Sequence, residues 1–102
     1  MITEEQLGAI KEVLSLSDSQ RDPFRRYTIL TMQLADVGEC IEYMKAYPSF
    51  TDAYKAELKV ALSDLLTQTL TMIVLYGLDP NGILNLGIER LEEFRKKGPF
   101  VE

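Results

Sequence analysis

The stretch from Leu65 to Leu78 contains no charged residue, and it constrains the fold more than any other part of the chain. A helix at the edge of a small monomer is apolar on one face, whereas this segment is apolar around most of its circumference. A second protein surface should cover it, because exposed apolar patches of this size generally mark an interface. We therefore predict a homo-oligomer, either a homodimer or a homotetramer built as a dimer of dimers, formed through this helix and the helix before it.

Punctuation residues divide the chain into four expected helices. Thr3 and Gln6 have the spacing of a capping box, Asp22 with Pro23 has the pattern of a helix start, and Gly77 provides a left-handed stop. The expected helices cover about residues 3–14, 23–46, 51–76 and 80–97, the last ending near Gly98-Pro99. No period-two alternation of apolar residues is sustained, so the sequence predicts no strand. We expect an all-α fold, with residues 1–102 forming a single domain that is a four-helix bundle.

Composition excludes several classes of function. The net charge of −5 argues against a nucleic-acid polymer as partner, because phosphate backbones are bound by clustered Lys and Arg. A single cysteine, Cys40, permits no internal disulfide and fits a buried residue in a reducing compartment. No signal peptide is visible, and no charge-free run reaches the roughly 20 residues of a membrane span. The expected location is the cytoplasm, without a membrane partner.

Three carboxylates stand out on the second and third expected helices. Asp36 and Glu39 are three residues apart and share a face, and Asp36 lies within a second apolar stripe of its helix. Asp64 is the last charge before the neutral stretch and also lies in an apolar stripe. Hard cations such as Mg²⁺ or Mn²⁺ favour several carboxylates from adjacent elements, and a chain without histidine is a poor candidate for zinc. The plain alternative is a helical bundle whose acidic residues are simply solvated.

Three segments resemble the MazG-type nucleotide pyrophosphohydrolases. In that family the second helix reads close to Leu-x-Glu-Glu-x-Gly-Glu-x-x-Glu, which is similar to residues 34–42, LADVGECIE. A later Glu-x-x-Asp-Leu-Leu motif resembles residues 61–66, ALSDLL, and the turn LYGLDP at 75–80 resembles the one before the family's last helix. The motifs follow the order and spacing found in the family, and the resemblance covers most of the chain.

The resemblance implies an all-α, oligomeric enzyme that uses Mg²⁺ to hydrolyse nucleoside triphosphates to the monophosphate and pyrophosphate. By this resemblance Asp36, Glu39 and Asp64 match metal ligands, while Ala61 stands where a fourth ligand is expected. Arg90 replaces a lysine found near the phosphates in the family.

Further candidates for the site come from the residues around these positions. Glu42 lies one turn beyond Glu39 and is a candidate to orient the attacking water. Glu57 is two turns from Asp64, roughly 10 Å along the helix, and is assigned to a second cation or a water-bridged shell. Arg25 and Arg26 gain nothing from the dipole at a helix N-terminus, which makes them candidates for phosphate contact.

Two functions from different classes follow. One is a Mg²⁺-dependent nucleotide pyrophosphohydrolase with an altered ligand set, acting in cleansing of the nucleotide pool. The other is a catalytically inactive relative that keeps the oligomeric bundle as a nucleotide-binding or protein-interaction module. The two functions differ in whether catalysis survives the loss of a ligand at Ala61.

Overall fold

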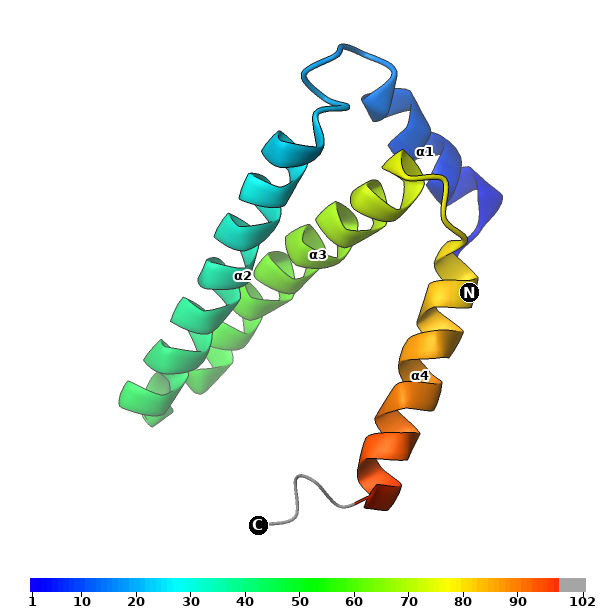
Figure 1. The fold of residues 1–102 in the computed structure, drawn as a ribbon. Coiled ribbons are helices and arrows are strands. Elements are labelled where there is room, and N and C mark those ends of the chain that lie inside the picture. Colours follow the sequence, from blue (N-terminus) through cyan, green and yellow to red (C-terminus); the bar gives the residue numbers. More distant parts are fainter. Residues whose placement is uncertain (98–102) are drawn as a thin grey trace.

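The computed structural model describes residues 1–97, which form four α-helices and one short 3₁₀ turn (Figure 1). The elements are α1 (Glu4–Leu14), α2 (Pro23–Ala46), η1 (Pro48–Phe50), α3 (Thr51–Leu75) and α4 (Pro80–Lys97). Residues 1–97 contain no strand, so the predictions of an all-α fold and of four helices are confirmed. The predicted stop at Gly98-Pro99 lies outside the described residues.

Local capping signals set the helix ends as the sequence predicts. The Thr3 hydroxyl accepts a hydrogen bond from the Gln6 amide at 3.1 Å, and the Gln6 side chain accepts one from the Thr3 amide at 2.8 Å. The Asp22 side chain accepts a hydrogen bond from the Phe24 amide at 3.1 Å and caps α2. Gly77 has a φ of 67°, which a residue with a side chain adopts at a cost. The turn η1 was not predicted.

Helices α2 and α3 lie side by side and form an antiparallel hairpin (Figure 1). Its core consists of Val37 and Cys40 from α2 and Ala61 from α3, with Leu58 and Leu65 packed against them. Among the described helices, α1 packs against α3 alone. The hairpin is therefore the scaffold that holds the predicted acidic residues of α2 and α3.

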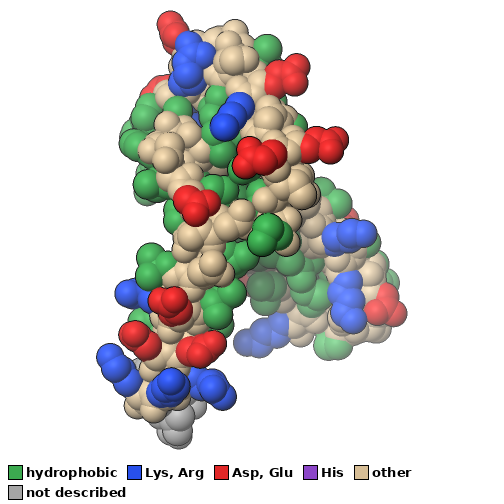
Figure 2. Space-filling view, turned by 90° about the vertical axis from the view of Figure 1, so that its right-hand side faces the viewer, with side chains coloured by type: hydrophobic (Ala, Val, Ile, Leu, Met, Phe, Trp, Pro, Cys, Tyr) green, Lys and Arg blue, Asp and Glu red, His purple; other side chains and the backbone are tan. Residues whose placement is uncertain are grey.

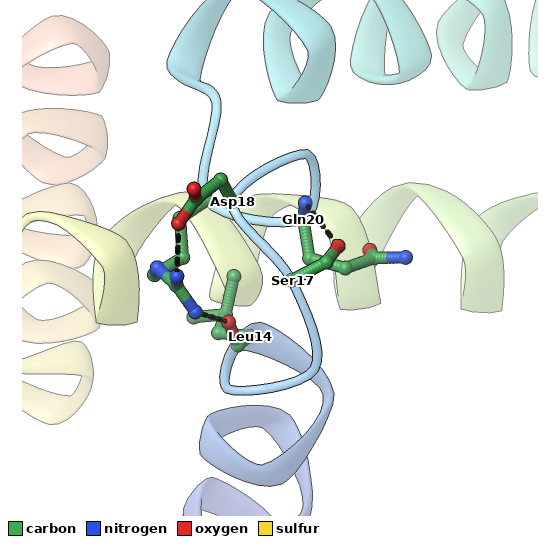
Figure 3. A network of polar contacts seen from close by, with 5 residues as sticks. Leu14, Ser17, Asp18 and Gln20 are labelled. Carbon is green, nitrogen blue, oxygen red and sulfur yellow. Dashed lines mark hydrogen bonds and ion pairs between the residues drawn. The ribbon is translucent and has the colours of Figure 1, made fainter.

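Arg21 holds the loop between α1 and α2 through hydrogen bonds to Leu14 and Asp18, two of the residues labelled in Figure 3. Its guanidinium donates to the Leu14 carbonyl oxygen at 2.7 Å and to an Asp18 carboxylate oxygen at 2.5 Å. The Gln20 amide donates to the Ser17 hydroxyl at 3.3 Å. These contacts hold the end of α1 close to the loop that leads into α2.

Arg26 joins this loop to the hairpin. Its side chain is buried, and its guanidinium donates to the backbone oxygen of Gln20 at 2.7 Å, to the side-chain oxygen of Gln20, and to the side-chain oxygen of Gln68 at 3.1 Å. Burial and then the neighbouring charge of Arg25 lower the pKa of Arg26, which stays charged. Arg26 thus links the α1–α2 loop, α2 and α3 at the end of the hairpin where α2 begins.

Helix α4 departs from the expected bundle. It packs only against α3 among the described helices and diverges from the hairpin (Figure 1). The radius of gyration is 16.4 Å, against roughly 13 Å expected for a compact chain of this length. One chain by itself therefore does not close a four-helix bundle.

The predicted core faces are only partly covered within one chain. Val37 is buried, but Leu34 and Ile41 on the same stripe of α2 are 59% and 53% exposed, and Leu62 on α3 is 46% exposed. Leu34 and Ile41 are seven residues apart and therefore form an apolar strip on one face of α2, which residues 1–97 leave uncovered.

Among residues 1–97, one segment is long and apolar enough by composition to cross a membrane. It is Pro48–Leu75, which contains an 18-residue stretch with a mean hydropathy of 1.4 and with 17% of that stretch buried in the chain. Core helices of soluble proteins satisfy the same criteria. The cytoplasmic location stays a prediction.

Candidate functional site: an acidic groove on the helical hairpin

A groove of about 500 Å³ runs between α2 and α3 on one face of the hairpin. Four carboxylates line it, two from each helix, and small or apolar side chains line the remainder. The lining residues are Asp36, Glu39, Cys40, Ala56, Glu57, Val60, Ala61 and Asp64. The antiparallel pairing of the two helices brings together acidic residues that are up to 28 positions apart in the sequence.

Helical spacing explains why these side chains share one groove. Asp36, Glu39 and Cys40 are three and four residues apart on α2, and Glu57, Ala61 and Asp64 are separated by four and three residues on α3. Cys40 and Ala61 are 8% and 7% exposed and belong to the hairpin core. The floor of the groove is thus the core itself, with carboxylates along its two walls.

Ala61 lies in this floor, where the predicted fourth ligand is missing. Its small side chain is buried in the contact between α2 and α3. Glu57 lies one turn before it and lines the same groove as Asp36, Glu39 and Asp64. The groove therefore has four carboxylates even without a glutamate at position 61.

The pKa of the Cys40 thiol reflects the negative charge of this groove. Burial raises its pKa from the ordinary value of 9.0, and the carboxylates of Glu57, Glu39 and Asp36 raise it further, in that order. Negative charge from both helices thus acts on a single side chain in the floor. In residues 1–97, none of the four groove carboxylates forms an ion pair.

The three predicted metal ligands line the groove but are not gathered into a ligand cluster. Asp36, Glu39 and Asp64 all face it. Within the described part of the chain, no three Asp, Glu or Cys side chains lie close enough together to hold a metal ion. The donor set of carboxylate oxygens fits a hard cation, and the side chains would have to converge by rotation about their own bonds to bind one.

Other predicted site residues lie outside the groove. Glu42 is exposed on α2 and does not line it. Arg25 donates to the Ser19 hydroxyl at 3.0 Å, and Arg26 is occupied by Gln20 and Gln68. Arg90 lies on α4, where its guanidinium is 5.6 Å from the centre of the Phe94 ring.

An aromatic stack adjoins the end of the groove nearest η1. The Tyr43 ring is stacked on Tyr54 with ring centres 5.3 Å apart and on Tyr47 with ring centres 6.4 Å apart. Tyr43 is one turn beyond Glu39, and Tyr54 is one turn before Glu57. The stacking of Tyr43 on Tyr54 follows from the hairpin, because the two rings come from different helices.

Comparison of this chain with protein-family models, curated proteins and solved structures gives no match.

Proposed function

We propose that this protein is a Mg²⁺-dependent nucleoside triphosphate pyrophosphohydrolase of the MazG-like type, acting in the cytoplasm as a homo-oligomer. The observation that carries the proposal is the groove in which Asp36 and Glu39 of α2 face Glu57 and Asp64 of α3 without a cationic partner. Like charges that share a groove are costly unless a cation meets them. A divalent cation, Mg²⁺ or alternatively Mn²⁺, would neutralise these carboxylates and is bound by oxygen ligands of this kind.

Asp36, Glu39 and Asp64 would hold the cation, and Glu57, two turns before Asp64 on α3, adds a carboxylate to the same groove. When bound, the cation neutralises phosphate oxygens and lowers the pKa of bound water. The remaining requirement is a carboxylate that accepts a hydrogen bond from the attacking water. Glu57 lines the groove and is better placed for that role than Glu42, which does not line it.

Phosphate recognition needs positive charge that the groove itself does not contain. Arg25 is exposed at the start of α2 and has one hydrogen bond, to Ser19, so its side chain is available at small cost. Arg26 would have to break three hydrogen bonds to reach a phosphate. We therefore rank Arg25 and Arg90 above Arg26 as phosphate contacts.

The second candidate function is a catalytically inactive module that binds a nucleotide or another protein. Two observations favour it: Ala61 provides no ligand, and the carboxylates of the groove are not gathered around one point. In this case the groove would bind a ligand without cleaving it.

Calorimetric titration with Mg²⁺ and with Mn²⁺, with and without a nonhydrolysable triphosphate, separates the two candidates. We expect binding that Asp64→Asn weakens at least tenfold, because one charged ligand is lost. Glu12→Gln is the matched control, since it removes one exposed carboxylate from α1, outside the groove. Absence of binding to either ion at millimolar concentration contradicts the metal assignment.

Pyrophosphate release is then measured across canonical and modified triphosphates. Metal binding with no release from any of them supports the inactive module. Release that Glu57→Gln abolishes, while metal binding persists, supports the assignment of Glu57 to the water.

A further inference from the structure

Helix α4 carries an apolar stripe that its own chain leaves uncovered. Leu84, Ile88 and Leu91 are spaced by four and three residues, so they lie on one face, and they are 51%, 47% and 68% exposed. Figure 2 shows hydrophobic side chains along α4 and on the surface between α4 and the rest of the molecule. Exposed stripes of this kind generally indicate a binding surface.

Two sets of contacts fix the direction in which α4 leaves α3. The Leu78 amide donates to the Ile73 carbonyl oxygen and the Gly77 amide to that of Val74, both at 3.0 Å, with Gly77 at positive φ. This arrangement ends α3 and turns the chain away from the hairpin.

The start of α4 is tied to the N-terminus. The Ile2 amide donates to the side-chain oxygen of Asn81 at 3.3 Å, and the Asn81 side-chain nitrogen donates to the Ile2 carbonyl oxygen at 3.4 Å. Pro80, at the first position of α4, is buried. Folding α4 back onto its own α2 would break these contacts, and in the described residues α4 does not pack against α2.

The amount of exposed surface indicates what kind of partner is missing. The accessible surface of the chain is 7881 Å². A compact monomer of 11.6 kDa is expected to expose roughly 5,800 Å², so the excess is roughly 2,000 Å². Obligate homodimers bury about 1,000–2,500 Å² on each subunit. A second copy of this chain therefore fits the area.

Charge favours the acidic groove as the surface that α4 meets on the second copy. The last turn of α4 carries Arg95, Lys96 and Lys97, and Arg90 lies on the same helix. The groove carries four carboxylates with no cation, and Val60 beside them is 60% exposed. An apolar stripe that ends in basic residues matches an acidic groove with an apolar wall.

We propose that α4 of one copy lies along the groove face of the α2–α3 hairpin of a second copy. The stripe of Leu84, Ile88 and Leu91 packs beside Val60, and the basic residues of α4 approach the carboxylates. The partner copy thus contributes the positive charge that the groove lacks, while the apolar strip of Leu34 and Ile41, which does not line the groove, stays available for pairing of the two hairpins. This arrangement does not depend on the groove being catalytic.

Cross-linking between two singly labelled chains tests the arrangement. In a Cys40→Ala background, three chains carry Leu84→Cys, Ile88→Cys or Leu91→Cys, and each is mixed with a chain that carries Val60→Cys. A bis-maleimide of roughly 10 Å reach, longer than a disulfide, tolerates the unknown register. We expect a covalent heterodimer for at least one pair, and none when Glu12→Cys on α1 replaces Val60→Cys.

Absence of a heterodimer in all three mixtures overturns the proposal. So does a monomer at 100 µM in sedimentation velocity with the unmodified chain. As a second variant that leaves every apolar contact in place, Arg95→Gln should raise the dimer dissociation constant severalfold at low salt, whereas Lys11→Gln on α1 should not. Equal effects of the two variants contradict the role given to charge.

Discussion

The α2–α3 hairpin and helix α4 are built from the same local signals, yet only the hairpin has a core of its own. Asp22 caps α2 and Asp79 caps α4, since the Asp79 side chain accepts a hydrogen bond from the Asn81 amide at 3.2 Å. Val37 in the hairpin is 9% exposed, whereas Leu91 in α4 is 68% exposed. Capping and periodicity thus determine that a helix forms, and packing determines whether the helix is held against the rest of its chain.

The largest expected effect on stability comes from Arg26, at the end of the hairpin where α2 begins. Arg26→Met should lower the free energy of unfolding by about 3 kcal/mol, because oxygens of Gln20 and Gln68 lose a charged donor in a buried place. Arg25→Met should change it by less than about 0.5 kcal/mol, since Arg25 is exposed. Urea denaturation at fixed protein concentration measures both. Similar values for the two variants would show that the loop is not held by Arg26.

Truncation of one apolar side chain in each region compares packing directly. Val37→Ala should cost about 2 kcal/mol at every protein concentration, because it opens a cavity in the hairpin core. Leu91→Ala should cost less than about 0.5 kcal/mol in dilute protein and more where copies associate. The measurement is thermal unfolding at two concentrations about a hundredfold apart. A cost for Leu91→Ala that is independent of concentration would contradict the separation of α4 from its own chain.

The two caps provide a smaller, matched comparison. Asp22→Ala should lower the free energy of global unfolding by about 1 kcal/mol. Asp79→Ala should instead speed amide hydrogen exchange within α4 and leave global unfolding of the dilute monomer nearly unchanged, because α4 opens locally. Hydrogen exchange read by mass spectrometry, together with urea denaturation, distinguishes these results. Equal loss of global stability in both variants would place α4 in the same cooperative unit as the hairpin.

The smallest expected effect is a pH dependence from Cys40. Its pKa is raised above 9.0 in the folded protein by burial and by the groove carboxylates, so the folded state holds the thiol proton more tightly than the unfolded state. This contribution to stability is complete below pH 9.0 and is lost as the pH rises through the folded-state pKa. Cys40→Ala should therefore lose less stability than the unmodified chain between pH 8 and pH 10.5, measured by urea denaturation.

The sequence predicted much of the secondary structure because its signals are local. The Thr3–Gln6 capping box, the Asp22 cap and Gly77 each act within about four residues, so their effect does not depend on the rest of the fold. Burial of Cys40 was also expected from its residue type, and it is confirmed.

Asp36, Glu39 and Asp64 were predicted to act together as metal ligands, whereas Glu57 was assigned to a second cation or a water-bridged shell. A distance of two turns along one helix separated Glu57 from Asp64 in the sequence. The tertiary structure places both residues in one groove with Asp36 and Glu39 of α2, although they remain two turns apart on α3. Arg26 shows the reverse: it was a phosphate candidate by position, and tertiary hydrogen bonds occupy its guanidinium.

The sequence by itself determined that this chain is all-α, where its helices begin, and that its apolar surface exceeds what one small chain can bury. These follow from hydrogen bonds within a turn and from counting apolar residues on a helix face. Only the tertiary structure decided which carboxylates share a groove, which arginine is already engaged, and that α4 leaves the hairpin. Those properties depend on the angle at which helices meet, and that angle is set by packing and by a few fixed turns between distant segments.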